Sequence, residues 1–312
     1  MALSADRIKN YFTRQPLPRS AFQISSCYIS GIHVSPKEGK VKNYFILPLE
    51  KGVIQPSFYE KNIKNPAVLE KAVKEGLEKL NLSERKTACF IPELSLKAFV
   101  FSFNSLPASR QEREKVIRFR VKKQVPLFPE DARFSFDLIR SNDSTKVVSV
   151  IARSAVVQEY EDFFAKLRLR VKAVGVPTLS LYNLMNKEKE RDALLINIEE
   201  DSLSLIAVVN SEIVLYRQKP FILSSQSDFF GPQAVETIVK EVENTVNFVE
   251  DKEKRKVQSF WVRLGLMHKG EEMFSLLNEK SSFPFKGIKE GLTSKLGSEE
   301  RQILSPLFGQ IL

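Results

Sequence analysis

The chain has 312 residues, of which 43% are hydrophobic and 28% charged, with only 12 Gly and 15 Pro. This composition is typical of a globular protein and excludes a disordered or fibrous chain. The length predicts two domains, or one domain with two lobes, because a single core stops growing near about 250 residues. The net charge of +10 favours acidic partner surfaces, either anionic lipid or nucleic acid, and is also typical of a lysine-rich solvated surface.

Few residues are available for metal or thiol chemistry. Cys27 and Cys89 lie in apolar runs and are interpreted as small core residues of a protein from a reducing compartment. His33 and His268 are far apart in sequence, so no metal site is predicted. The chain has no stretch that approaches the roughly 20 apolar residues of a membrane span. Because the N-terminus also lacks the apolar core of a signal peptide, we expect a cytoplasmic protein.

The first half begins with a basic leader over residues 1–20. Its segment 6–14 has the spacing of a short amphipathic helix that could lie on anionic lipid or on a partner, and a frayed tail is the alternative. The elements predicted after the leader are, in chain order, strands over 21–34 and 41–49, a helix over 66–80, strands over 87–91 and 96–103, a helix over 109–125, strands over 133–139 and 147–151, a helix over 154–167, a strand over 171–176 and a helix over 178–185.

Capping residues support three of these helices. Asn65 is expected to cap the first and Ser154 the third, while Ser109 and Glu112 have the spacing of a capping box at the start of the second. That second helix is strongly basic, and Val116, with its neighbours, gives it an apolar side.

The second half follows a charged run near residue 190. Its predicted elements are strands over 193–198, 203–209 and 213–217, a long helix opened by Gly231 and Pro232, a strand over 258–264, a helix around Met273, and a tail punctuated by Gly and Ser. Glu199, Glu200 and Asp201 at a strand end could bind a cation, although an exposed turn is the preferred interpretation. The pattern indicates mixed sheets covered by helices in two lobes.

No nucleotide, hydrolase or metalloprotease motif is present. The sequence contains no G-x-x-x-x-G-K-[ST], G-x-G-x-x-G, G-x-S-x-G or H-E-x-x-H. The chain has two His residues, which leaves few candidates for a His-based nucleophile dyad. We therefore predict no catalytic residues.

A family resemblance appears in the order of several motifs. Leu106-Pro107 precedes the basic helix, Gln124-Val125-Pro126-Leu127 ends it, Val171 to Pro177 leads back to the main body, and Lys240 to Phe248 forms a late helix. This order resembles the type IV pilus assembly protein family PilM and covers nearly the whole chain from Ala21. The resemblance implies an α/β fold similar to actin and the cell-division protein FtsA, with two lobes and an inserted small α/β subdomain. The lobes would cover residues 21–190, with the insertion at about 105–170, and 191–312.

The decisive nucleotide positions depart from the family pattern. Each phosphate hairpin of that fold begins with an Asp-x-Gly, but Gln23 and Ser25 stand in the first hairpin and Asn197 and Glu199 in the second. The family also has a late Gly-Gly that contacts the nucleotide base, and this pair is missing after the strand over 260–264. These losses predict a degenerate cleft with no cofactor; an altered actin-like ATPase that still binds ATP and Mg²⁺ is the alternative.

The resemblance implies a non-catalytic scaffold of a pilus or related secretion platform at the inner membrane. Its partner would be the cytoplasmic N-terminal tail of a PilN-type single-span membrane protein, with pilus motor ATPases as further contacts and no nucleic acid. A type II secretion protein of the GspL type has a similar fold but carries a membrane span. We expect the tail to lie between the first lobe and the insertion, with Arg118, Phe119 and Lys122 of the basic helix as contacts and Phe119 contributing to the stability of the fold.

Overall fold

The structure is a computed structural model that describes residues 18–35, 41–82, 84–140, 144–185, 190–221, 232–267, 270–288 and 296–311. Most of the predicted leader, the connection over 36–40, the turn over 141–143 and His268 lie outside the described residues. The expectation of a lipid-binding leader helix therefore stays a prediction.

The first lobe is built on a five-stranded mixed sheet with the strand order β3-β2-β1-β4-β8. Its strands are β1 (Ser20–Ile24), β2 (Tyr28–Val34), β3 (Val41–Pro48), β4 (Lys86–Phe90) and β8 (Arg170–Gly175). Residues 21–34, expected as one strand, are two antiparallel strands joined by a tight turn in which Ser25 N–H donates to the carbonyl of Tyr28 at 2.9 Å. Both strands are buried on both faces, so the segment lacks the alternation of apolar and polar residues that would have marked the turn.

Helices cover both faces of this sheet. α2 (Pro66–Leu80) and α4 (Ser154–Lys166) pack on one face, and the C-terminal α8 (Ser298–Ile311) packs on the other through Leu304, Leu307 and Phe308. The predicted cap of α2 is confirmed, since Asn65 accepts from Val68 N–H. The predicted cap of α4 is wrong, because Ser154 is the first helical residue and its hydroxyl donates to the carbonyl of Asp131.

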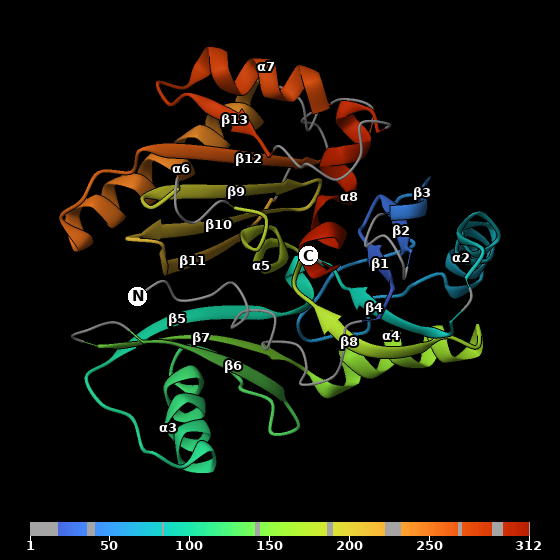
Figure 1. The fold of residues 1–312 in the computed structure, drawn as a ribbon, viewed down its shortest axis with the longest axis horizontal. Coiled ribbons are helices and arrows are strands. Elements are labelled where there is room, and N and C mark those ends of the chain that lie inside the picture. Colours follow the sequence, from blue (N-terminus) through green and yellow to red (C-terminus); the bar gives the residue numbers. More distant parts are fainter. Residues whose placement is uncertain are drawn as a thin grey trace.

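The second lobe repeats this plan with a sheet in the order β11-β10-β9-β12-β13. Its strands are β9 (Ala193–Glu199), β10 (Ser202–Val209), β11 (Glu212–Pro220), β12 (Ser259–Gly265) and β13 (Phe285–Gly287), and its helices are α6 (Pro232–Glu253) and α7 (Gly270–Lys280). The turn between β10 and β11 has positive φ at both Asn210 and Ser211, as a two-residue hairpin requires. Figure 1 shows the two lobes with α8 at their junction.

A three-stranded sheet forms the small subdomain, in the order β5-β7-β6. It consists of β5 (Lys97–Phe103), β6 (Arg133–Arg140) and β7 (Thr145–Ala152), with α3 (Arg110–Lys122) on its outer face (Figure 1). The strands of this sheet lie within Lys97–Ala152. β5 therefore lies before the expected start of the insertion at about 105, whereas α4, inside the expected bounds, packs on the first lobe. The expected capping box of α3 is wrong, since Ser109 makes no side-chain cap hydrogen bond.

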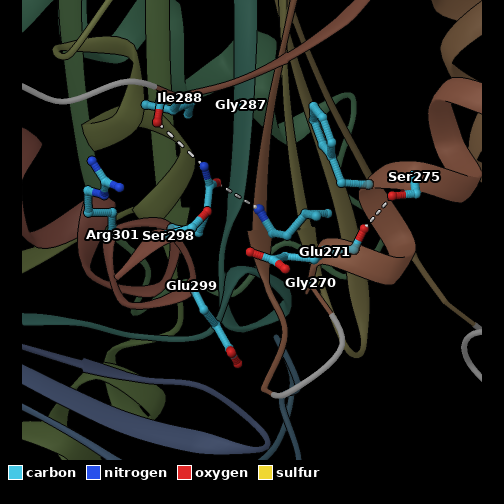
Figure 2. A pocket seen from close by; sticks show the side chains of 11 residues that line it. Gly270, Glu271, Ser275, Gly287, Ile288, Ser298, Glu299 and Arg301 are labelled. Atoms are coloured by element: carbon cyan, nitrogen blue, oxygen red, sulfur yellow. Dashed lines mark hydrogen bonds between the residues drawn. The ribbon is translucent and has the colours of Figure 1, made fainter. Parts of the chain in front are cut away.

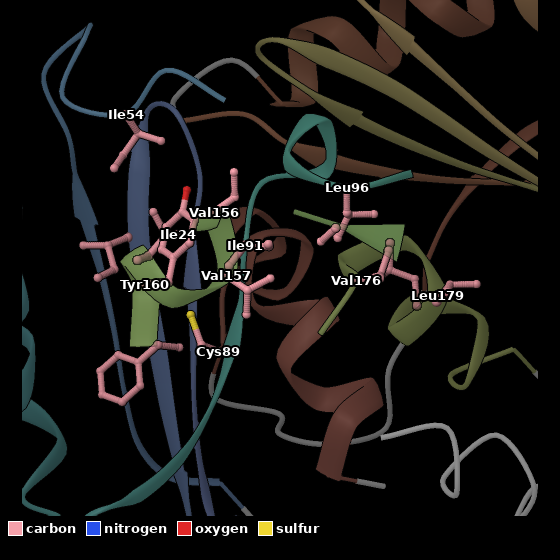
Figure 3. Packing of buried hydrophobic residues seen from close by; sticks show 14 of the residues in the cluster. Ile24, Ile54, Cys89, Ile91, Leu96, Val156, Val157, Tyr160, Val176 and Leu179 are labelled. Carbon is pink, nitrogen blue, oxygen red and sulfur yellow. The ribbon is translucent and has the colours of Figure 1, made fainter. Parts of the chain in front are cut away.

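One hydrophobic core runs through both lobes. Leu195, Ile206 and Tyr216 of the second lobe pack in the same cluster as the side chains of the first lobe in Figure 3, such as Ile24 and Tyr160. The short helix α5 (Pro177–Tyr182) joins this cluster through Leu179, Leu181 and Tyr182. The junction of the lobes is therefore largely packed side chains, and the two sheets with a small third sheet agree with the expected two-lobed α/β architecture.

Candidate functional site

The turns at the ends of β1 and β9 face each other at the lobe junction. Their four predicted side chains, Gln23, Ser25, Asn197 and Glu199, are all less than 5% exposed. One carboxylate oxygen of Glu199 accepts from Gln23 Nε2 at 3.1 Å, and the other accepts from Ser25 Oγ at 3.3 Å. The two hairpins are thus joined directly across the junction, and Glu199 does not lie in the exposed turn that we expected.

Arg263 of β12 completes this cluster, and the sequence reasoning did not single it out. Its side chain is fully buried, and all five of its N–H groups have an acceptor. These acceptors are Asn197 Oδ1 at 3.0 Å, a carboxylate oxygen of Glu199, the hydroxyl of Tyr28 at 2.7 Å, and the carbonyls of Gln302 at 2.8 Å and Ile303 at 3.0 Å. The only sequence signal is one arginine inside an apolar strand.

The Arg263–Glu199 ion pair is buried, with side-chain exposures of 0% and 6%. Burial raises the pKa of Glu199, and the guanidinium of Arg263 opposes that shift. The same burial raises the pKa of Tyr28, whose hydroxyl accepts from Arg263 and Gln23 Nε2 and donates to Glu199. Gly265 is required beside the pair, because a Cβ there would lie 2.3 Å from Arg263 Nη1 and 2.4 Å from Glu199 Oε2.

The hydrogen-bond network continues to a second buried carboxylate. Asn197 Nδ2 donates to Thr178 Oγ1 at 2.9 Å, and both the hydroxyl and the backbone N–H of Thr178 donate to Glu93. The hydroxyl of Tyr216 donates to the other oxygen of Glu93. Burial raises the pKa of Glu93, since these hydrogen bonds only partly offset the loss of water.

These residues do not fit a magnesium nucleotide. The position between the two turns, where the fold would hold phosphates, is filled by a guanidinium and a carboxylate that satisfy one another. A phosphate beside Glu199 would meet like charge, and neither turn supplies an acidic residue of the usual kind at 23 or 197 for Mg²⁺. Within the described residues, no group of three or more His, Cys, Asp or Glu could hold a metal ion.

A cavity of about 730 Å³ lies at the end of β12, between the first turns of α7 and α8. Figure 2 shows Glu271 on one side of it and Ser298, Glu299 and Arg301 on the other. The side chain of Gln302 lines this cavity while its carbonyl binds Arg263, so the buried ion pair lies behind the cavity wall. A triphosphate that reached from here to the turn at Ser25 would have to displace that pair.

A second hollow, called the edge groove below, lies between β6, β8 and α4 and has a volume of about 270 Å³. β6 and β8 are the edge strands of their sheets. The groove is lined by Ile91, Leu96, Arg133, Phe134, Ser135, Val150, Ala152, Val157, Glu161, Lys172, Ala173, Val174 and Val176. Its rim is bridged by Arg133, which binds both carboxylate oxygens of Glu161, at 2.6 and 2.8 Å. Two sheet edges with an apolar lining suit an extended peptide.

The three residues expected to bind the partner lie on α3 and are not part of the groove lining. Arg118 comes nearest, since its guanidinium lies 5.0 Å from the ring centre of Phe134. Phe119 is 61% exposed and Lys122 is exposed, so the expected contribution of Phe119 to the core is wrong. Ile117 and Val121 on the opposite side of the helix make the core of the subdomain.

Comparisons with solved structures support this fold. A chain from a structure described as the PilM-PilN type IV pilus biogenesis complex superposes with a TM-score of 0.71 and 16% identity, over 94% of this chain and 97% of that one. The cytoplasmic domain of EpsL, an inner-membrane component of the type II secretion system of Vibrio cholerae, superposes with a TM-score of 0.53 and 10% identity, over 92% and 94%.

These likenesses show that the chain has the PilM-type actin-like fold. No family model and no curated protein matches the sequence. In the described ranges of the chain, no helix combines the length and hydropathy that a bilayer crossing needs.

Proposed function

We propose that this protein is a non-catalytic scaffold that binds the cytoplasmic N-terminal tail of a PilN-type membrane protein, at the cytoplasmic face of a pilus or secretion platform. The observation that carries the proposal is the fold shared over nearly its whole length with a chain of a PilM-PilN complex. The filled phosphate position supports the absence of catalysis, because Arg263 and Glu199 occupy it.

The edge groove is the binding site in this proposal. An extended tail that pairs with a sheet edge satisfies its main-chain groups there and places alternate side chains on the apolar lining. Such a tail pays ordering entropy on binding, so it needs both the main-chain pairing and the apolar contacts.

The test is a titration of the full chain with synthetic N-terminal tails of single-span membrane proteins from the same organism, followed by fluorescence anisotropy. Val174→Trp fills the groove and should lower the affinity at least roughly tenfold, because it displaces the apolar contacts of the tail. Arg133→Glu should also weaken binding, because it breaks the bridge to Glu161 at the rim.

Arg170→Glu is the matched control, since this exposed residue of β8 is outside the groove lining and changes the net charge equally. Thermal unfolding of each variant checks that the fold is retained. Tight binding of a tail that Val174→Trp and Arg133→Glu leave unchanged would move the site elsewhere. No binding of any tail would refute the proposed partner.

The alternative function is an ATPase with altered hairpins, and the cavity beside β12 is the one observation in its favour. Calorimetry with ATP, with and without Mg²⁺, separates the two. We expect no Mg²⁺-dependent saturation at micromolar ATP, and such saturation would show that the altered hairpins still bind the nucleotide, as the alternative requires.

A further inference from the structure

Most of the exposed large apolar side chains lie on α3 and in the turn that follows it. Of the five large hydrophobic residues that the described part of the chain exposes, Val116, Phe119 and Leu127 belong to α3 and the turn after it. A fourth, Tyr59, is joined to the same turn by a hydrogen bond from its hydroxyl to the carbonyl of Pro126 at 3.0 Å. Clustered exposed apolar side chains indicate an interaction surface, whereas scattered ones do not.

The fold itself does not require these side chains. Ile117, Val121 and Val125 make the contacts that hold α3 on its sheet, and all three are buried. Leu127 is 87% exposed and has a φ of 53°, a backbone conformation that Leu rarely adopts. Neither packing within the chain nor backbone preference therefore explains a leucine at this position. A contact with another molecule explains it.

Positive charge surrounds the exposed apolar residues. Residues 110–123 contain seven Arg or Lys and two Glu, and Lys115, Arg120, Lys122 and Lys123 are all exposed. Nζ of Lys123 lies 4.5 Å from the ring centre of Phe119, so the charge and the apolar group share one surface. A partner for this surface must accept apolar side chains and carry negative charge around them.

We infer that α3 and its following turn dock on an anionic lipid bilayer, with Phe119 and Leu127 entering the interface and the neighbouring lysines contacting lipid headgroups. Interfacial helices bind in this way, through apolar burial and attraction to anionic headgroups together. Nucleic acid fits less well, because the aliphatic side chains of Val116 and Leu127 offer no face for base stacking. Figure 1 shows α3 on the side of the small sheet that faces away from the second lobe, where a flat surface can approach it.

The experiment is flotation of the full chain with phosphatidylcholine vesicles that contain or lack phosphatidylglycerol. We expect binding only to the anionic vesicles and weaker binding as salt is raised. Lys122→Glu with Lys123→Glu should lower the affinity at least roughly tenfold, since each basic residue near the surface contributes roughly fivefold. Phe119→Ser with Leu127→Asn should lower it roughly tenfold or more through lost burial, and Asn suits the positive φ.

Lys240→Glu with Lys256→Glu is the matched control, because both residues are exposed outside α3 and the change in net charge is the same. The control should keep its affinity within roughly threefold, since salt screens distant charges. Equal losses in the control and the α3 variants would overturn the inference. Unchanged vesicle binding by the α3 variants would also overturn it, because the lipid contact would then lie elsewhere in the chain. Tail binding at the edge groove is measured without vesicles, so each proposal can fail alone.

Discussion

The buried Arg263 donates a hydrogen bond to the helix carbonyl that Pro306 leaves without its usual N–H donor. Pro306 lies inside α8 and has no N–H to donate to the carbonyl of Gln302, four residues earlier. Nε of Arg263 donates to that carbonyl at 2.8 Å, and Ser305 Oγ donates at 2.7 Å. Because the proline cannot donate to it, the carbonyl of Gln302 is available to accept a hydrogen bond from the buried guanidinium of Arg263.

Replacing Arg263 with Met should destabilise the protein by about 3–5 kcal/mol, because Glu199 would be left as an uncompensated buried charge. Adding Glu199→Gln to this variant should recover part of the loss, since the orphaned charge is then removed. Urea unfolding of the single and double variants measures both effects. A loss below about 1 kcal/mol for Arg263→Met would show that the pair does not hold the junction.

Gly265→Ala should destabilise the protein, because its Cβ would lie within 2.4 Å of both members of the ion pair. Gly270→Ala is a matched control, since the nearest atom to its Cβ is 4.0 Å away. We expect a loss of about 1–3 kcal/mol for the first change and less than about 0.5 kcal/mol for the second in thermal or urea unfolding. Equal effects of the two changes would contradict the close approach.

Glu93→Gln should change how stability depends on pH. The pKa of Glu93 is raised in the folded state, so the native protein binds this proton more tightly than the unfolded chain. The contribution of Glu93 to stability therefore falls as pH rises from about 4.5 through the folded pKa, by about 1.4 kcal/mol per pKa unit. The variant lacks this loss and should gain stability relative to the wild type as pH rises. Urea unfolding of both proteins from pH 4 to about 8 tests this, and a difference that is constant across pH would contradict it.

Ile117→Ala and Phe119→Ala should separate the two sides of α3. Ile117 is fully buried, and its truncation should cost about 2–5 kcal/mol. Phe119 is 61% exposed, and its truncation should change the free energy of unfolding by less than about 0.5 kcal/mol. Urea unfolding compares them, and a large loss for Phe119→Ala would mean that this ring packs inside the subdomain.

Local signals were sufficient to predict the elements with strong caps or periodicity. α2 begins where Asn65 and Pro66 predict, and α6 follows as a long helix whose apolar residues, such as Val235 and Val242, pack in the core of the second lobe. The turn inside 21–34 was missed because its flanking strands are buried on both faces, so no alternation of exposed polar residues marks where the first strand ends. α8 was missed because Pro306 and nearby Gly and Ser residues are typical of a loop, whereas packing on the first sheet stabilises the helix.

The candidate site was predictable only in part. The resemblance assigned Gln23 and Ser25 to one hairpin and Asn197 and Glu199 to another. In the structure all four side chains are buried, and Glu199 accepts hydrogen bonds from Gln23 and Ser25. Arg263 was not predictable, because its meaning depends on acceptors from β2, β9 and α8, which are distant in sequence. The edge groove depends on which strands end their sheets, and strand order is a tertiary property that local patterns do not encode.

The core that runs through both lobes also decides where this chain can be divided. A fragment that stopped near residue 190 would keep the first sheet but lose Leu195, Ile206 and Tyr216, which cover side chains of the first lobe. It would lose α8 as well, and with it the cover of the opposite face of that sheet. The halves are therefore expected to be insoluble when expressed alone and to regain solubility when co-expressed, as complementing fragments of one cooperative folding unit.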